Sequence, residues 1–297
     1  MLISNGQFRA RARAVLKSGW QVAMLVGFIA TIPSLIRLVA EHFLDGSLMD
    51  RLFNAMSDAT ILQLSSSTWL VTTALGLIDA RLIISWIISL ICFLGAPVLT
   101  VGMYAQQQAM LEGRETAVSD AFSRVGIWSK AVLTNLLVIL RSLVWFLPGL
   151  GVYALALVLY SNSQGSYLAA YLADAGFILG VVLAVRCYLR YGMSLFILAR
   201  KPETGIMEAQ RRSKTMMQGK LGAYFFLVFS FLWMLLLAML LDTYLESWIG
   251  AVAGSTIFMI LQVIIQVYQS TACNAFYLAL EVPEAPVNEN PAEKEVL

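Results

Sequence analysis

Six long apolar stretches, separated by shorter polar connectors, run through the chain. They lie at about residues 19–40, 82–110, 128–160, 172–199, 220–241 and 249–280. An α-helix needs about 20 apolar residues to cross the roughly 30 Å hydrocarbon core of a bilayer, and each stretch meets that length. The pattern therefore predicts an all-α integral membrane protein with six transmembrane helices.

The third stretch, 128–160, is too long for one straight crossing, and it contains Pro148-Gly149. Proline removes one helix hydrogen bond and crowds the preceding turn, and the adjacent glycine is flexible. We therefore expect a kink or a break at this point. The result would be a bent span, or a span followed by a short shallow helix.

The polar connectors differ in charge, and the difference predicts a topology. Lysine and arginine concentrate in the N-terminal segment, in 111–127 and in 200–219, whereas 161–171 and 242–248 contain neither. Cytoplasmic loops of membrane proteins are enriched in these residues, so we expect both termini in the cytoplasm. We interpret the basic N-terminal segment and the apolar run after it as a retained first span, because no clear signal cleavage site follows.

The connector at 41–81 contains a further candidate span, 60–78, which includes Gln63 and several serines and threonines. Its full insertion would invert every later helix and place the basic connectors outside the cell. We therefore expect 41–81 to be an extracytoplasmic connector. Segment 60–78 would be either re-entrant or lie along the membrane surface.

Two of the basic connectors share a sequence pattern. Residues 115–121 read ETAVSDA and residues 203–209 read ETGIMEA, with three of seven positions identical. A lysine, Lys130 or Lys220, begins the apolar stretch after each block, and Lys17 has the same place in a looser third copy. We expect three repeated units of an amphipathic interfacial helix plus a transmembrane hairpin, an arrangement that can hold a ligand between units. The alternative is that duplication only built the scaffold. The units would be about 1–110, 111–199 and 200–280 of a single domain, 1–280.

The first of these short helices is amphipathic. Its basic side carries Arg9, Arg13 and Lys17 at a spacing of four residues, and Phe8, Ala12, Val15 and Leu16 fall on the other side. This pattern is typical of a helix at the headgroup boundary, where each cation near anionic lipid contributes on the order of 1 kcal/mol. Arg211, Arg212 and Lys214 repeat the basic character in the third unit. We expect all six cations to lie at the membrane surface, either for anchoring or as a regulatory docking surface.

Composition narrows the class of protein. Hydrophobic residues make up 59% of the 297 residues, only 13% are charged, and the mean hydropathy is +0.76. These values exclude an ordinary cytosolic enzyme, a disordered protein and a nucleic-acid binder. His42 is the one histidine, and the three cysteines lie far apart inside apolar stretches. We therefore expect no metal site, no cofactor, no disulfide framework and no catalytic residues.

Four arginines lie within the predicted spans. Arg37 and Arg190 can extend towards an interface, but Arg141 and Arg186 lie about 20 Å from the cytoplasmic ends of their helices, near the midplane. An arginine at that depth is energetically costly, and no carboxylate accompanies it. A polar stripe on the last span suggests a cavity that accepts an anion, because guanidinium groups suit phosphate. The alternative is that these arginines bond carbonyls, glutamines or the Pro148 region. The predicted ligand-binding residues are Arg141, Arg186, Arg190, Gln262 and Gln266.

A pattern in the last third of the chain is similar to a known family. Ser213, Met216, Met217, Gly219 and Lys220 form S-x-x-M-M-x-G-K, followed by Ser230-Phe231, Trp233, Tyr268 and Phe276-Tyr277, with Pro148-Gly149 upstream. Together they resemble a bacterial membrane-protein family catalogued as domain of unknown function 975, most closely over 200–280. Val267 stands where that family tends to have proline, and there is extra sequence around 150–185. The resemblance implies a six-helix protein of the bacterial cytoplasmic membrane, with no established activity. A distant similarity to the membrane region of some bacterial glycerophosphodiesterases points towards lipids.

Two hypotheses for function follow. The first is a non-enzymatic membrane protein that binds or transports a lipid or another amphipathic anion. The alternative is a structural or accessory subunit of another membrane complex, such as an ABC exporter. The expected partners are membrane lipids, with anionic lipid at the cytoplasmic face, and in the alternative a membrane protein; nucleic acid is not expected. The acidic, proline-containing tail, 281–297, is predicted to be disordered and cytoplasmic.

Overall fold

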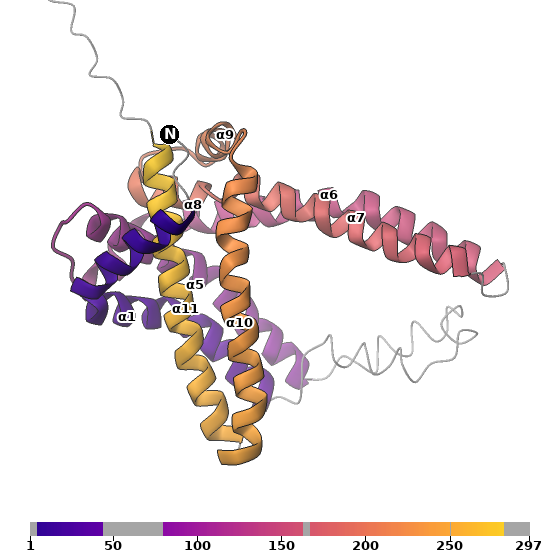
Figure 1. Ribbon diagram of the computed structural model, residues 1–297, viewed down its shortest axis with the longest axis horizontal. Helices are drawn as coiled ribbons and strands as arrows, with labels where there is room; N and C mark the ends of the chain where they lie inside the picture. Colours follow the sequence, from indigo (N-terminus) through magenta and orange to yellow (C-terminus); the bar gives the residue numbers. More distant parts are fainter. Residues whose placement is uncertain (1–4, 44–79, 163–166, 250, 282–297) are drawn as a thin grey trace, which may run out of the picture.

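The computed structural model describes residues 5–43, 80–162, 167–249 and 251–281, and every regular element in those ranges is helical. The predicted segment 60–78 and the tail after Glu281 lie outside the described residues. The elements are α1 (Asn5–Phe43), α5 (Ala80–Leu111), the 3₁₀ turns η1 (Val118–Phe122) and η2 (Val125–Ile127), α6 (Trp128–Asn162), α7 (Tyr167–Tyr191), α8 (Ser194–Arg200), α9 (Ile206–Met216), α10 (Leu221–Ile249) and α11 (Ala251–Leu280). The α-helices are labelled in Figure 1.

The all-α class and the six long apolar helices are confirmed. Six stretches of the described chain are long and apolar enough to cross a membrane. The three repeated units and the direction of insertion stay predictions. The six stretches are Asn5–Arg37, Ile83–Leu111, Val118–Tyr160, Tyr167–Arg200, Leu221–Leu245 and Thr256–Leu280.

Helix α1 changes direction at Gly19, whose backbone is not helical (φ −128°, ψ 29°). The part before Gly19 has the two faces that the sequence pattern predicts. Phe8 and Ala12 are buried, whereas Arg13 and Lys17 are exposed. The kink therefore separates a short amphipathic helix from the apolar helix that follows it.

One local expectation was wrong, and another is decided in part. Helix α6 runs without interruption through Pro148, so the break is absent there, whereas the alternative of a bent span stays a prediction. Before α6, the second unit has the two short 3₁₀ turns η1 and η2 in place of an amphipathic α-helix. Within α6, the residue after the proline, Gly149, packs against the neighbouring helix, and this tertiary contact is compatible with a continuous helix.

Buried amides join α5 to α11. Gln107 Nε2 donates to Ser270 Oγ at 2.7 Å, and Asn274 Nδ2 donates to Gln107 Oε1 at 2.8 Å. Gln108 Nε2 donates to Asn274 Oδ1 at 2.9 Å and to the carbonyl oxygen of Phe196 in α8 at 3.1 Å. Gln107, Gln108 and Asn274 are all at most 2% exposed. The network therefore sets the register of three helices inside an apolar surrounding, where an unpaired amide would be costly.

The largest buried apolar cluster lies beside this network. It brings together side chains of α1, α8, α10 and α11, among them Phe8, Phe196, Phe231 and Tyr277. Phe8 meets Phe276 edge to face, with ring centroids 5.3 Å apart. The amphipathic start of α1 is thus held against α11.

Helices α6 and α7 form an arm that projects from the rest of the molecule (Figure 1). They approach each other closely, because a Cβ on Gly149 would come within 2.2 Å of the amide nitrogen of Gly180. In the most apolar 18-residue segment of 118–160, only 11% of the residues are buried, whereas the corresponding share within 256–280 is 39%. The arm does not run parallel to α10 and α11, so both hairpins cannot follow one membrane normal in this arrangement.

Replacing Asn274 by alanine tests the amide network. The change leaves Gln107 Oε1 and one Gln108 amide hydrogen without their side-chain partner, and a buried unpaired group costs about 1–3 kcal/mol. We expect a lower midpoint of thermal unfolding in detergent micelles. Gln262→Ala, an exposed position on the same helix, is the control and should change stability by less than about 0.5 kcal/mol. Equal midpoints for the two variants would contradict the network.

A pair of glycine substitutions tests the closeness of the arm. Gly149→Ala forces a methyl group against the α7 backbone, and overpacking of this kind costs about 1–3 kcal/mol. We expect faster amide hydrogen exchange in both α6 and α7. Gly151→Ala is the control, because nothing lies within 4 Å of the added Cβ, and it should leave exchange unchanged or slower. If both variants exchange alike, the two helices are not in close contact at Gly149.

Candidate functional site

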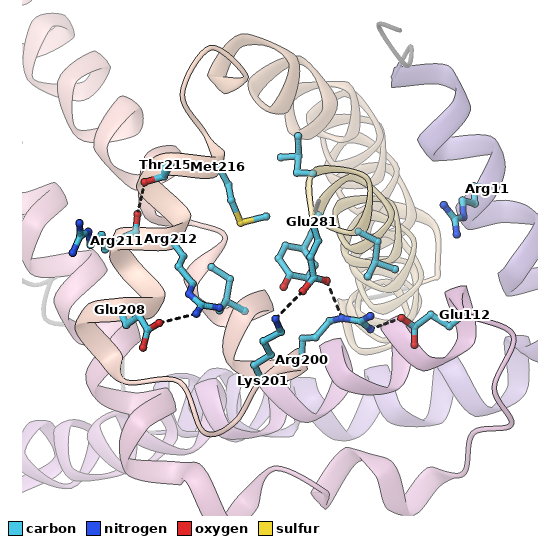
Figure 2. Close-up of a pocket in the computed structure, with 14 residues that line it drawn as sticks. Arg11, Glu112, Arg200, Lys201, Glu208, Arg211, Arg212, Thr215, Met216 and Glu281 are labelled. Carbon is cyan, nitrogen blue, oxygen red and sulfur yellow. Dashed lines mark hydrogen bonds and ion pairs between the residues drawn. The ribbon is translucent and has the colours of Figure 1, made fainter. Parts of the chain in front are cut away.

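A charged pocket lies where α5, α8 and α11 end, and α9 and the first part of α1 complete its walls (Figure 2). Its volume is about 840 Å³. Five of the lining side chains are cationic and three are carboxylates, which leaves an excess of two positive charges. The lining consists of Arg11, Glu112, Ile197, Arg200, Lys201, Glu208, Arg211, Arg212, Thr215, Met216, Tyr277, Leu278, Leu280 and Glu281.

Two glycines determine where the chain turns at this end of the molecule. Gly113 has φ 74° and directly follows Glu112, and Arg114 N donates to Ala109 O at 2.9 Å, so α5 closes with a left-handed glycine. Gly219 has φ 70° and lies between α9 and α10. These turns place Glu112 at the pocket and return the chain from α9 to the core.

Arg200 occupies the centre of a chain of ion pairs. Its Nη1 donates to Glu112 Oε1, and its Nε lies 2.8 Å from Glu281 Oε2. Lys201 Nζ lies 3.8 Å from the other oxygen of Glu281, and Arg114 Nη2 lies 2.5 Å from the other oxygen of Glu112. The ends of α5, α8 and α11 are therefore connected through the Arg200 guanidinium, as Figure 2 shows.

The side chains of Glu112, Arg200 and Glu281 are only 23–29% exposed, so water screens these charges incompletely. Burial raises the pKa of the Glu112 carboxyl, but hydrogen bonds from Arg200 and Arg114 outweigh this effect and hold the pKa below its ordinary value. Glu112 is therefore a carboxylate at neutral pH.

The other pocket cations differ in their partners. Arg212 Nη2 lies 2.7 Å from Glu208 Oε1, an exposed pair one turn apart on α9. Arg11 Nη2 donates to the carbonyl oxygen of Leu111 at 3.3 Å and so caps the end of α5. Within the described part of the chain, no carboxylate pairs with Arg211. Figure 2 places Arg11 and Arg211 on opposite sides of the pocket, with Arg200 between them.

The structure does not gather the five predicted ligand-binding residues around this pocket, since none of them lines it. Arg141 lies at the base of the arm, where its guanidinium carbon is 4.8 Å from the centre of the Tyr191 ring. Arg141 Nη2 is also 3.8 Å from Met207 Sδ. The Arg190 carbonyl accepts a hydrogen bond from Ser213 Oγ at 3.0 Å.

The remaining predicted ligand residues lie on two helices, α7 and α11. Arg186 is exposed on α7, Gln262 is exposed on α11, and Gln266 is half-buried there. No hydrogen bond between these described side chains joins α7 to α11. A ligand-binding role for these residues, and for Arg141 and Arg190, stays a prediction.

The six residues predicted at the membrane surface fall into three groups. Arg211 and Arg212 line the pocket, whereas Arg13, Lys17 and Lys214 are exposed away from its lining. The Arg9 side chain is half-buried, and the carbonyl of this residue accepts a hydrogen bond from Tyr268 Oη at 3.4 Å.

Two features escaped prediction from the sequence. The run Gln106-Gln107-Gln108 inside an apolar stretch is a visible signal for a buried polar contact, and two of these residues form the network to α11. Glu281 is the first residue of the predicted acidic tail, yet its carboxylate is paired with Arg200. No local pattern distinguishes Glu281 from the acidic residues after it.

Comparison with known proteins identifies the family of this chain. No curated protein and no solved structure matches the chain. The model of a family described as "Protein of unknown function (DUF975)" matches residues 51–283, a longer range than the resemblance over 200–280. Because this match covers most of the chain, the protein belongs to the DUF975 family.

Proposed function

We propose that this protein is a non-enzymatic, multi-pass membrane protein that binds an amphipathic anion, with the anionic group in the charged pocket. The observation that carries the proposal is the excess of cations in a concave, half-buried place at the helix ends. Guanidinium groups favour phosphate and carboxylate, and incomplete screening strengthens the attraction.

The apolar part of the lining favours an amphipath over a small soluble ion. Ile197, Met216, Leu278 and Leu280 contribute hydrocarbon to the same pocket as the cations. Ile197 also belongs to the buried apolar cluster, and Met216, Leu278 and Leu280 pack against it. A headgroup could therefore lie among the arginines while its chain continues along apolar surface.

The position along the chain supports an anionic lipid as the first candidate. The pocket lies at the end of the molecule that carries the most basic connector, 200–219, and the basic start of α1. The charge pattern predicts that this end faces the cytoplasm, where the membrane leaflet is rich in anionic lipid. Anionic lipid of a bacterial cytoplasmic membrane is the ligand class that we propose.

Neutralising two α9 arginines tests the anion site. Each cation near anionic lipid is worth on the order of 1 kcal/mol, so Arg211→Gln with Arg212→Gln should weaken binding of phosphatidylglycerol by roughly tenfold or more. Bound lipid would be counted by native mass spectrometry of the protein in micelles, with phosphatidylcholine of the same acyl chains as reference. Inorganic phosphate is added as a competitor. It should displace the lipid if the site binds the headgroup alone, and it should fail to do so if binding also needs the acyl chains.

Lys214→Gln is the matched control, since Lys214 is an exposed cation on the same helix outside the pocket lining. It should leave lipid binding unchanged. Two further variants, Arg141→Ala and Arg186→Ala, test the sites predicted from the sequence. If only these two variants lose lipid binding, the site lies at the base of the α6–α7 arm and not in the charged pocket. No preference for phosphatidylglycerol over phosphatidylcholine in the unchanged protein would refute the proposal.

The arm favours a second candidate function, an accessory subunit of another membrane complex. Along the outer part of α6 and α7, large apolar side chains such as Leu155, Leu159 and Ile178 are exposed. The arm packs mainly on itself and projects beyond the other helices. A helix pair with this shape presents a long surface for a partner helix.

A stoichiometric partner is the expected result for the accessory role. Purification in mild detergent should return a second membrane protein in constant ratio to this chain, and Leu155→Arg with Ile178→Arg on the arm should release it. Leu136→Arg, near the base of α6, serves as a comparison for a general effect of charge in an apolar helix. Recovery of this chain by itself, folded and at one stable mass, would count against the accessory role.

A further inference from the structure

The centre of the pocket is already occupied by a carboxylate of the chain itself. Glu281 Oε2 lies 2.8 Å from Arg200 Nε, and Glu281 Oε1 lies 3.8 Å from Lys201 Nζ. One carboxylate thus faces two cations from α8 and the residue after it. The same two donors would suit a carboxylate or phosphate oxygen of an external ligand.

We propose that Glu281 is a displaceable internal counter-ion, and that the anionic group of the ligand replaces its carboxylate on Arg200 and Lys201. Because this role presupposes the anion site proposed above, it adds to that site a definite subsite and a mechanism of release. Displacement breaks the contact between the end of α11 and the end of α8. Binding is therefore coupled to loosening of the last turn of α11.

The two carboxylates on Arg200 differ in how firmly they are held. Glu112 accepts from two arginines, with Arg200 on one oxygen and Arg114 on the other, and these hydrogen bonds lower its pKa. Glu281 shares only Arg200 at close range, because 3.8 Å to Lys201 exceeds hydrogen-bond length. Glu281 is accordingly the more weakly held of the two carboxylates on Arg200. Glu112 keeps the Arg200 guanidinium in place after Glu281 leaves.

The position of Glu281 at a helix end also favours its release. The carboxyl end of a helix carries a partial negative charge, which repels a carboxylate and attracts a cation. Glu281 directly follows α11, which ends at Leu280, and its amide still donates to Tyr277 O at 3.0 Å. Its side chain can leave Arg200 while only the last backbone turn is affected.

Removing the charge of Glu281 should strengthen ligand binding. An ion pair of this exposure contributes modestly, so Glu281→Gln should lower the dissociation constant for phosphatidylglycerol in micelles by about two- to fivefold. Glu208→Gln is the matched control, because it removes an equal charge from the same pocket but frees Arg212 in place of Arg200. Its effect should be clearly smaller. In an Arg200→Gln background the gain from Glu281→Gln should disappear.

Hydrogen exchange gives a second measurement, because a purely structural role of Glu281 would not make exchange depend on lipid. Phosphatidylglycerol should speed exchange of the amides at 278–281 in the unchanged protein. In Glu281→Gln these amides should exchange quickly before any lipid is added. Thermal midpoints of all variants confirm that they are folded.

The possible outcomes separate the two proposals. Selective lipid binding that is equal or weaker in Glu281→Gln, or that rises equally in Glu208→Gln, overturns the displacement mechanism and leaves the proposed function standing. Absence of selective binding in every variant overturns both. Tighter binding in Glu281→Gln alone, lost with Arg200→Gln and accompanied by the exchange change, supports the mechanism.

Discussion

The hydrogen bonds of Gln107 and Gln108 with Asn274 are the interaction on which the arrangement of the other helices depends. An amide buried in apolar surroundings must find a partner within the protein, because neither lipid nor packed hydrocarbon supplies one. Apolar helices can slide along one another at little cost, whereas the side-chain amides of α5 and α11 can form their hydrogen bonds in only one register. The bond from Gln108 to the Phe196 carbonyl extends that register to α8. The pocket exists because these three helices then end at the same level.

Close packing of two backbones is the main contact between the helices of the arm. In the arm, Gly149 and Gly180 let two backbones approach closely, and this contact fixes α6 on α7. The arm therefore differs from the α5–α11 pair in kind. Close packing holds two helices to each other, while buried amides hold three helices in a defined register.

Much of the fold could be predicted from the sequence, because it depends on periodic properties that single segments display. The apolar runs predicted six long helices, and the spacing of Phe8, Ala12 and Arg13 predicted the two faces before the Gly19 kink. Pro148 left a break and a bend open, because its effect depends on what the neighbouring helix permits. The candidate site was harder to predict. The pairing of Arg200 with Glu281 joins residues about eighty positions apart, and only the register of α8 and α11 brings them together.

The convergence of helix ends explains why charge gathers in a chain that contains so little of it. Three carboxyl ends meet at the pocket, and their partial negative charges favour the cations Arg11, Arg200 and Lys201. Carboxylates at the same ends are tolerated only while those cations hold them. A ligand that supplies the negative charge from outside, with Glu281 released to water, satisfies the same cations and relieves the repulsion at the end of α11. The pairing of Glu281 with Arg200 therefore has the chemistry needed for an exchange of anions.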